Sequence, residues 1–330
     1  MSALRAVVLG CGTIGTGSGA APLHDDLGVW THAAAYAACE ATVLAGVADL
    51  DPERASAAAR AWGTERHATD PTALLVDAAP ELVSVCTPDA THAELVGLAL
   101  RTPGVRGVLA EKPLALDARE ARELVAVARD RGVVLAVNYT RRFAPAFAAL
   151  RAGLAEAIGI LQHVGGSYGK GLAHNGTHWL DLLRMLVGDP VAVRGWDRLG
   201  EGGEDPTLEA ALTLAGGAGA RLAGLDAGCF THFEMDLVGT RGRVRILESG
   251  HRIERWSVGP DPRHAGHRAL RPSVAVDAAL RDSTLHAVAD LAAAVRGGRA
   301  PACTGGDAVA ALELAGAIRE SATQGVAILS

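Results

Sequence analysis

The sequence has few lysines, few cysteines and no long apolar run. Of its 31 basic residues 29 are arginine, so that lysine occurs only as Lys112 and Lys170. The net charge is −6, which does not suit a nucleic-acid-binding surface. No uninterrupted apolar run approaches the roughly 18 residues that a membrane helix needs. Neither nucleic acid nor a membrane is therefore an expected partner.

The cysteines are too scattered to predict a disulfide framework. None of the five belongs to a CxxC pair, which also argues against a structural zinc site. Residues 1–10 hold an apolar stretch that is too short for a signal peptide and predicts a first strand. The composition is 49% apolar and 21% charged, and 330 residues are enough for two domains. We therefore expect a cytoplasmic enzyme.

A glycine-rich motif follows the first predicted strand. The apolar run at 5–9 leads directly into Gly10-Cys-Gly12-Thr-Ile-Gly15. After a strand, such glycines allow a tight turn and the close approach of backbone amides to a pyrophosphate. Residues 16–30 are rich in glycine and contain Pro22, so they predict an inserted loop at the cofactor site rather than a continuous helix.

An acidic residue ends the second predicted strand. The apolar run at 43–48 is followed by Asp49, whose carboxylate could accept hydrogen bonds from the adenosine ribose. Asp49 lies further from the motif than the usual spacing of about 20 residues, and the insertion accounts for the excess. A carboxylate here repels a 2′-phosphate and favours NAD, although the nearby Arg54 leaves NADP open.

The two halves of the chain differ in their strand pattern. Strands alternate with helices over 1–140, which predicts a doubly wound parallel sheet, a Rossmann domain. The second half, 141–330, shows β-rich segments separated by glycine turns and two closing helices, near 284–296 and 306–322. The predicted fold is therefore α/β, with a second domain built on an open, mostly antiparallel sheet.

One of the two lysines lies at an edge where ligands bind. Glu111-Lys112-Pro113 follows a predicted parallel strand at 105–110, and open α/β sheets bind ligands at the carboxyl ends of their strands. Pro113 restricts Lys112 to an extended backbone. A compact amine at this place can contact a substrate, whereas the alternative is an ordinary surface lysine.

Several polar residues cluster before a predicted helix in the second half. Lys170, His174, Asn175 and His178 fall within nine residues, among glycines. His178 is expected in the first turn, where the helix dipole disfavours imidazolium and a histidine can both give and accept a proton. The spacing of His174 and His178 could suit zinc, but Gly176 lies between them and the HEXXH glutamate is missing. We expect no metal.

In their order and spacing, these segments resemble the Gfo/Idh/MocA oxidoreductases, the family of glucose–fructose oxidoreductase and inositol dehydrogenase. The resemblance covers the glycine motif, Asp49, the Thr87-Pro88 turn with His92, the Glu111-Lys112-Pro113 segment, Asn138-Tyr139 and Asn175 to Asp181. It implies that NAD, or NADP, is held by Gly10, Gly12, Thr13, Ile14, Gly15, Asp49, Thr87, Pro88, His92, Glu111 and Lys112. It implies substrate binding by Tyr139, Arg142, Tyr168, Lys170, Asn175 and His178.

The resemblance also implies the reaction. A hydride would pass between nicotinamide and a hydroxyl- or ketone-bearing carbon of a sugar, cyclitol or nucleotide sugar. Lys112 would contact the reacting oxygen and His178 would exchange its proton. His174 stands where inositol dehydrogenase-like members carry an aspartate. A homodimer or homotetramer is expected. The alternatives are reduction of an imine or another C=X bond, and a regulator that senses dinucleotide without catalysis.

Overall fold

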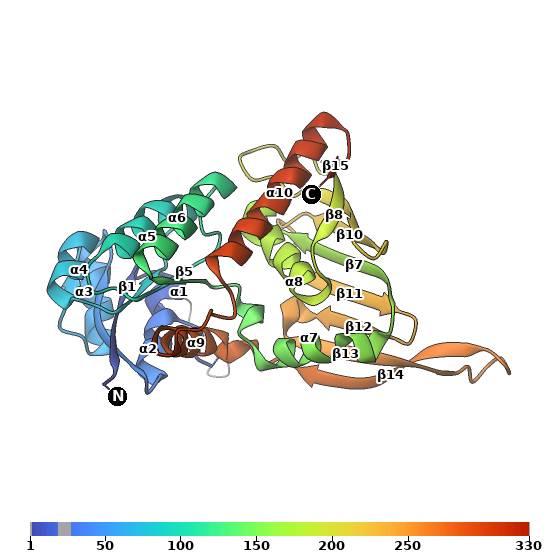
Figure 1. Cartoon of the computed structure of the whole chain (residues 1–330), viewed down its shortest axis with the longest axis horizontal. Coiled ribbons are helices and arrows are strands. Elements are labelled where there is room, and N and C mark those ends of the chain that lie inside the picture. Colours follow the sequence, from blue (N-terminus) through green and yellow to red (C-terminus); the bar gives the residue numbers. More distant parts are fainter. Residues whose placement is uncertain (1, 19–27, 330) are drawn as a thin grey trace. The chain divides into compact units, whose positions relative to one another are not determined.

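The computed structural model describes residues 2–18 and 28–329 (Figure 1). The chain forms two compact units, the first made of Met1–Phe143 and Arg281–Ala310, the second of Ala144–Leu280 and Ala311–Ser330. A single boundary at residue 140 therefore leaves out the return of the segment after Leu280 to the first unit. Part of the expected loop at 16–30 lies outside the described residues. No helix in the described ranges is long and apolar enough to cross a membrane.

The first unit contains the predicted doubly wound parallel sheet. Its strand order is β3-β2-β1-β4-β5-β6, and all of these described strands are parallel. The strands are β1 (Leu4–Leu9), β2 (Thr42–Ala48), β3 (His67–Ala68), β4 (Leu82–Val85), β5 (Gly107–Ala110) and β6 (Val134–Val137). Every residue of β4 and β5 is buried, as expected where helices cover both faces of a sheet.

Helices connect these strands. They are α1 (Thr13–Thr16), α2 (His32–Ala38), α3 (Pro52–Trp62), α4 (Pro71–Ala78), α5 (His92–Arg101), α6 (Ala118–Arg131) and, from the returning segment, α9 (Ser283–Gly297). Asp51 caps α3, because it accepts hydrogen bonds from the amides of Glu53 and Arg54, and Gly63 ends the helix at φ +66°. Short 3₁₀ turns at Asp89–Thr91 and Thr140–Arg142 follow β4 and β6.

The second unit is built on the expected, mostly antiparallel sheet. Among its described strands, in the order β14-β13-β12-β11-β7-β10-β9-β8-β15, only β7 and β10 pair in parallel. The strands are β7 (Leu161–Gly169), β8 (Pro190–Trp196), β9 (Glu209–Leu214), β10 (Gly219–Leu225), β11 (Phe233–Gly239), β12 (Gly242–Leu247), β13 (Arg252–Pro260), β14 (Arg268–Asp277) and β15 (Ile328–Leu329). Its helices are α7 (Pro145–Ile158), α8 (Thr177–Val187) and most of α10 (Gly305–Gln324).

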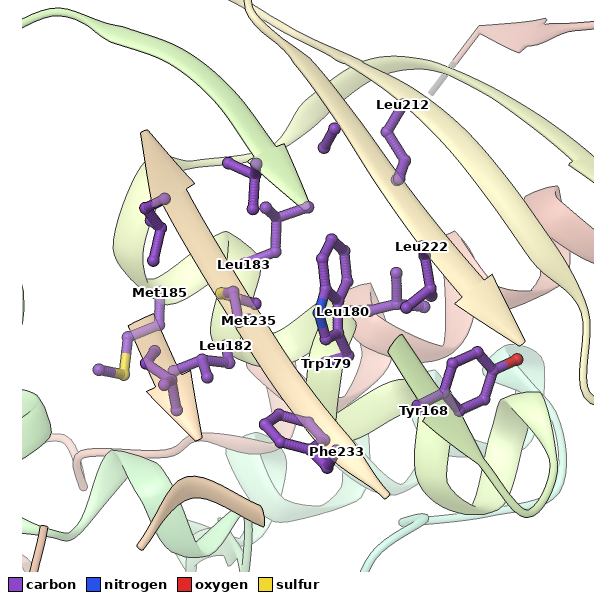
Figure 2. Close-up of a cluster of buried hydrophobic side chains, with 14 of the residues drawn as sticks. Tyr168, Trp179, Leu180, Leu182, Leu183, Met185, Leu212, Leu222, Phe233 and Met235 are labelled. Carbon is purple, nitrogen blue, oxygen red and sulfur yellow. The ribbon is translucent and has the colours of Figure 1, made fainter. Parts of the chain in front are cut away.

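Helix α8 buries its apolar side chains in the core of this unit (Figure 2). Trp179 is completely buried, and its indole nitrogen donates to the carbonyl oxygen of Glu234 at 3.1 Å. Gly166 on β7 makes room for this ring, because a Cβ atom there would overlap the indole nitrogen. The helix that carries His178 is therefore fixed by a close fit between an indole and a glycine.

This fit predicts the outcome of two glycine substitutions. Gly166→Ala should lower the free energy of unfolding by about 1–3 kcal/mol, because the indole must move. Gly153→Ala, in the middle of α7, should raise it by about 0.5–1 kcal/mol, since its added Cβ meets nothing within 4 Å. Urea unfolding of both variants measures the difference, and equal effects would show that the indole does not limit position 166.

Candidate active site

The three glycines of the motif have different surroundings in the loop between β1 and α1. Gly10 has φ +99°, and a Cβ there would lie 2.7 Å from the carbonyl oxygen of Cys86. A Cβ on Gly15 would overlap the carbonyl oxygen of Gly10, whereas one on Gly12 would meet nothing within 4 Å. Two glycines thus allow tight packing and the third leaves the loop open to an approaching group. Thr13 and Ile14, in the first turn of α1, are exposed.

Asp49 supports this loop from the end of β2. Its Oδ2 accepts from the amide of Cys11 at 2.8 Å, and its Oδ1 accepts from the amide of Asp51 at 3.0 Å. The guanidinium of Arg54 lies 3.3 Å from Oδ1. The carboxylate that was expected to meet the ribose therefore also orders the glycine motif. The buried Cys11 thiol is inert here, because burial, assisted by Asp49, raises its pKa to about 12.

A buried histidine ties the turn after β4 to the lysine segment. His92 is 1% exposed, and its Nδ1 and Nε2 lie 2.6 Å from the carbonyl oxygen of Pro113 and 2.7 Å from that of Thr87. Both ring nitrogens therefore face backbone carbonyl oxygens. The structure thus places His92, an expected cofactor residue, inside the protein. There its ring contacts the backbone of the Thr87-Pro88 turn on one side and that of Pro113 on the other.

Glu111 is surrounded by hydrogen-bond donors. Its Oε1 accepts from Asn138 Nδ2 at 2.7 Å and lies 3.0 Å from His32 Nε2, and its Oε2 lies 3.3 Å from the amide nitrogen of Lys112. Burial alone would raise the pKa of this carboxyl, but the hydrogen bond and charge of His32, with Asn138 and Lys112, bring the pKa below its ordinary value. Glu111 is therefore ionised at neutral pH. Sequence reasoning missed His32, which adjoins the insertion.

These residues fit a bound dinucleotide. The glycine loop, Asp49, Thr87 and Lys112 all lie at the carboxyl ends of neighbouring parallel strands, where such ligands bind. The Oδ1 atom of Asn138 is buried and has no hydrogen-bond partner among the described residues, so that a bound donor could use it. The open position at Gly12 would admit the pyrophosphate.

His178 lies in the first turn of α8, as expected. A π-turn at Leu172–Gly176 runs directly into this helix. Near the start of the π-turn, the amides of Ala173 and His174 donate to Asp205 Oδ1 at 2.7 Å and Oδ2 at 2.9 Å. The carboxylate of Asp205 therefore lies at the amino end of the combined helical segment.

Asp205 could not have been found from the sequence. It stands in an irregular, Gly- and acid-rich loop after β8, where no periodic pattern predicts its partners. Arg319 on α10 pairs with it at 3.4 Å. Both histidines, His174 and His178, are half-buried on the segment that this carboxylate anchors.

Two of the residues expected to bind substrate have partners within the protein. The ring of Tyr168 is fully buried, and its hydroxyl donates to the carbonyl oxygen of Leu208 at 2.8 Å. The guanidinium of Arg142 is 7% exposed and lies 3.1 Å from Asp307 Oδ1, so that it ties the turn after β6 to α10. Tyr139 is also buried, at 1% exposure.

The remaining polar residues of this segment lie at the end of β7. Asn175 Nδ2 donates to the carbonyl oxygen of Gly169 at 2.8 Å. Lys170 is exposed and has φ +73°, a conformation that lysine adopts only at a cost. Within the described ranges, no group of three or more His, Cys, Asp or Glu side chains could hold a metal ion.

Comparison with known proteins gives the family. The model of the Gfo/Idh/MocA oxidoreductase family's NAD-binding Rossmann fold matches residues 4–139, and the model of its C-terminal α/β domain matches residues 165–328. The chain therefore belongs to the Gfo/Idh/MocA oxidoreductase family, and the resemblance seen in the sequence is confirmed. Its first unit is an NAD-binding Rossmann domain.

The relatives are dehydrogenases. Inositol 2-dehydrogenase 2 of Paenarthrobacter aurescens is 33% identical over 195 residues, 52% of this chain and 57% of that protein. The structure of levoglucosan dehydrogenase with NADH and levoglucosan has a TM-score of 0.82 at 21% identity, covering 99% of both chains. UDP-N-acetylglucosamine 3-dehydrogenase GnnA of Acidithiobacillus ferrooxidans has a TM-score of 0.77 at 26% identity, covering 97% of this chain and 98% of that one. The chain spans a little over half the length of the first of these relatives.

The ionised state of Glu111 predicts a pH-dependent contribution to stability. Its folded-state pKa is below the ordinary value of 4.5, so the carboxylate stabilises the fold above that pH and this contribution is lost as the pH falls through the folded-state value. The free energy of unfolding should therefore differ most between wild type and Glu111→Gln near neutrality, and the difference should shrink in acid. Urea unfolding between neutrality and about pH 3 measures it.

The control is Glu123→Gln. Glu123 is an exposed partner of Arg119 on α6, and its loss should change stability little at any pH. A gap between wild type and Glu111→Gln that stayed constant into acid would contradict the ionised, hydrogen-bonded carboxylate.

Proposed function

We propose that this protein is an NAD-dependent dehydrogenase or ketoreductase. It would act on a hydroxyl- or ketone-bearing carbon of a sugar, a cyclitol or a nucleotide sugar. The observation that carries the proposal is the position of Lys112 at the carboxyl end of β5 in an NAD-binding domain. The carboxylate of Glu111 precedes it, and Pro113, whose carbonyl oxygen contacts His92, follows it. The dehydrogenase names of the relatives support the same class of reaction.

Each unit supplies one group suited to proton and charge movement. When bound, the nicotinamide cofactor supplies the hydride acceptor or donor. We propose that the ammonium of Lys112 donates a hydrogen bond to the reacting oxygen and stabilises charge that develops there. His178 would take the hydroxyl proton during oxidation and return it during reduction. His174, four residues earlier, would assist this proton exchange.

Lys170 is the candidate for substrate recognition. It is exposed, its charge lies at the end of β7, and it keeps a backbone conformation that most side chains avoid. Strained residues of this kind cluster at functional sites. We propose that it anchors a phosphate or carboxylate of the substrate, as a nucleotide sugar would offer.

The assembly and compartment belong to the same proposal. We propose a cytoplasmic homodimer or homotetramer in which the open sheet of the second unit meets its copy. Val274 and Val276 on β14, 51% and 40% exposed, support such an interface. Asp49 supports NAD rather than NADP, because its carboxylate would repel a 2′-phosphate.

Substitution of Lys112 tests the reaction most simply. Lys112→Met should lower kcat for a polyol substrate by about 10²–10⁴-fold, because the reacting oxygen loses its charged donor. Binding of NADH, from fluorescence titration, should remain measurable, because the glycine loop and Asp49 are unchanged. Arg131→Met, at an exposed position on α6, controls for the loss of any surface cation. Full turnover in Lys112→Met would refute the assignment.

Lys170 can be tested through its charge. Lys170→Ala should raise KM for a phosphate-bearing sugar by roughly tenfold, while KM for a neutral polyol changes less than about twofold. Lys170→Arg retains the charge and should restore most of the affinity. Steady-state kinetics on the two substrates measures the contrast, and equal effects on both would remove the anchor role.

A further inference from the structure

A chain of buried polar side chains runs from helix α2 to Glu111. The hydroxyl of Tyr36 lies 2.8 Å from Ser84 Oγ, and Ser84 Oγ lies 2.8 Å from His32 Nδ1. His32 Nε2 in turn lies 3.0 Å from Glu111 Oε1. Tyr36, Ser84 and His32 are each 0% exposed. A buried polar chain is costly unless each donor has an acceptor, so the positions of its hydrogen atoms are constrained.

The hydrogen atoms can be assigned from the partners. The ionised Glu111 only accepts, so that His32 Nε2 carries a hydrogen and donates it. Among the described residues Ser84 is the hydrogen-bond partner of the Tyr36 hydroxyl, which therefore donates to Ser84. Ser84 Oγ links this hydroxyl to His32 Nδ1. The hydrogen on His32 Nε2 thus points toward Glu111.

The order Ser84–His32–Glu111 is that of a hydrolase triad, but the environment excludes this use. Ser84 lies inside β4, is completely inaccessible, and already accepts a hydrogen bond from Tyr36. No substrate carbonyl could reach its oxygen. The end of the chain that approaches a reacting group is Glu111, next to Lys112.

We propose that His32 is a positioning residue for Lys112 and acts through the carboxylate of Glu111. This inference rests on the proposed function, in which Lys112 is the reacting amine. His32 and Asn138 hold Oε1, which leaves Oε2 facing the amide of Lys112 at 3.3 Å. Glu111 and Lys112 attract each other electrostatically. A carboxylate fixed in this way holds the ammonium form of the lysine and restricts its motion.

Two amide variants of His32 separate this role from simple packing. In His32→Gln the side-chain amide can reach the place of Nε2 and donate to Glu111, whereas in His32→Asn the shorter amide reaches only the place of Nδ1 beside Ser84. Both remove the imidazole ring. We expect His32→Gln to keep kcat within about threefold of wild type and His32→Asn to lose about tenfold or more in kcat with little change in KM.

Because the chain has only two lysines, chemical labelling of Lys112 gives a second measurement that does not depend on enzyme turnover. The reactivity of Lys112 toward an amine-acylating reagent can be followed by mass spectrometry of its peptide, with Lys170 in the same chain as the internal reference. His32→Asn should raise the labelling rate of Lys112 relative to Lys170 by roughly threefold or more, because the neutral amine becomes more populated. His32→Gln should leave the ratio near that of wild type, and Glu111→Gln should raise it further.

The outcomes distinguish the inference from the proposed function. Equal losses in both His32 variants, or an unchanged labelling ratio in His32→Asn, would overturn the positioning role. If His32→Asn does not fold, Ser84→Ala tests the same chain, and an unchanged labelling ratio there would count against it equally. If the labelling follows the expected order but wild type oxidises no polyol or sugar, the coupling of His32 to Lys112 stands and the assigned reaction fails.

Discussion

The placement of Lys112 in the first unit depends on an ionised carboxylate that is surrounded by hydrogen-bond donors. Glu111 can stay charged because His32 and Asn138 donate to one oxygen while the Lys112 segment meets the other. An isolated buried carboxylate would instead take up a proton. The parallel sheet makes this possible, since the ends of β4, β5 and β6 bring residues from distant parts of the chain to one edge.

Two buried histidines contact the Glu111-Lys112-Pro113 segment at different residues. His32 is the first residue of α2 and reaches the side chain of Glu111, whereas His92 is the first residue of α5 and reaches the carbonyl of Pro113. Lys112 thus lies between a residue whose side chain contacts His32 and a residue whose carbonyl oxygen contacts His92. In the second unit Asp205 plays a comparable part, because it accepts hydrogen bonds from amides near the start of the segment that carries His174 and His178. In each unit a carboxylate therefore lies next to the backbone of residues that we propose to act on the substrate.

The sequence predicted the features that depend on local patterns. The alternation of strands and helices, the glycine motif and the strand-end positions of Asp49 and Lys112 follow from periodicity and turn chemistry. Strands β13 and β14 were not predicted individually, and no residue of β14 is buried. Asp205 and His32 were missed since their roles arise from partners about 31 and 79 positions away. The burial of Tyr168 and the pairing of Arg142 with Asp307 were also not predicted, because burial by a distant segment leaves no local signal.

The central claim is that an amine and an imidazole serve one reacting oxygen. A crystal structure of the protein with NADH and a bound sugar or polyol tests it most directly. The account predicts that the Lys112 ammonium and the His178 ring both lie within about 3 Å of the same substrate oxygen. A complex in which either side chain points away from the substrate, or in which they meet different ligands, would contradict it.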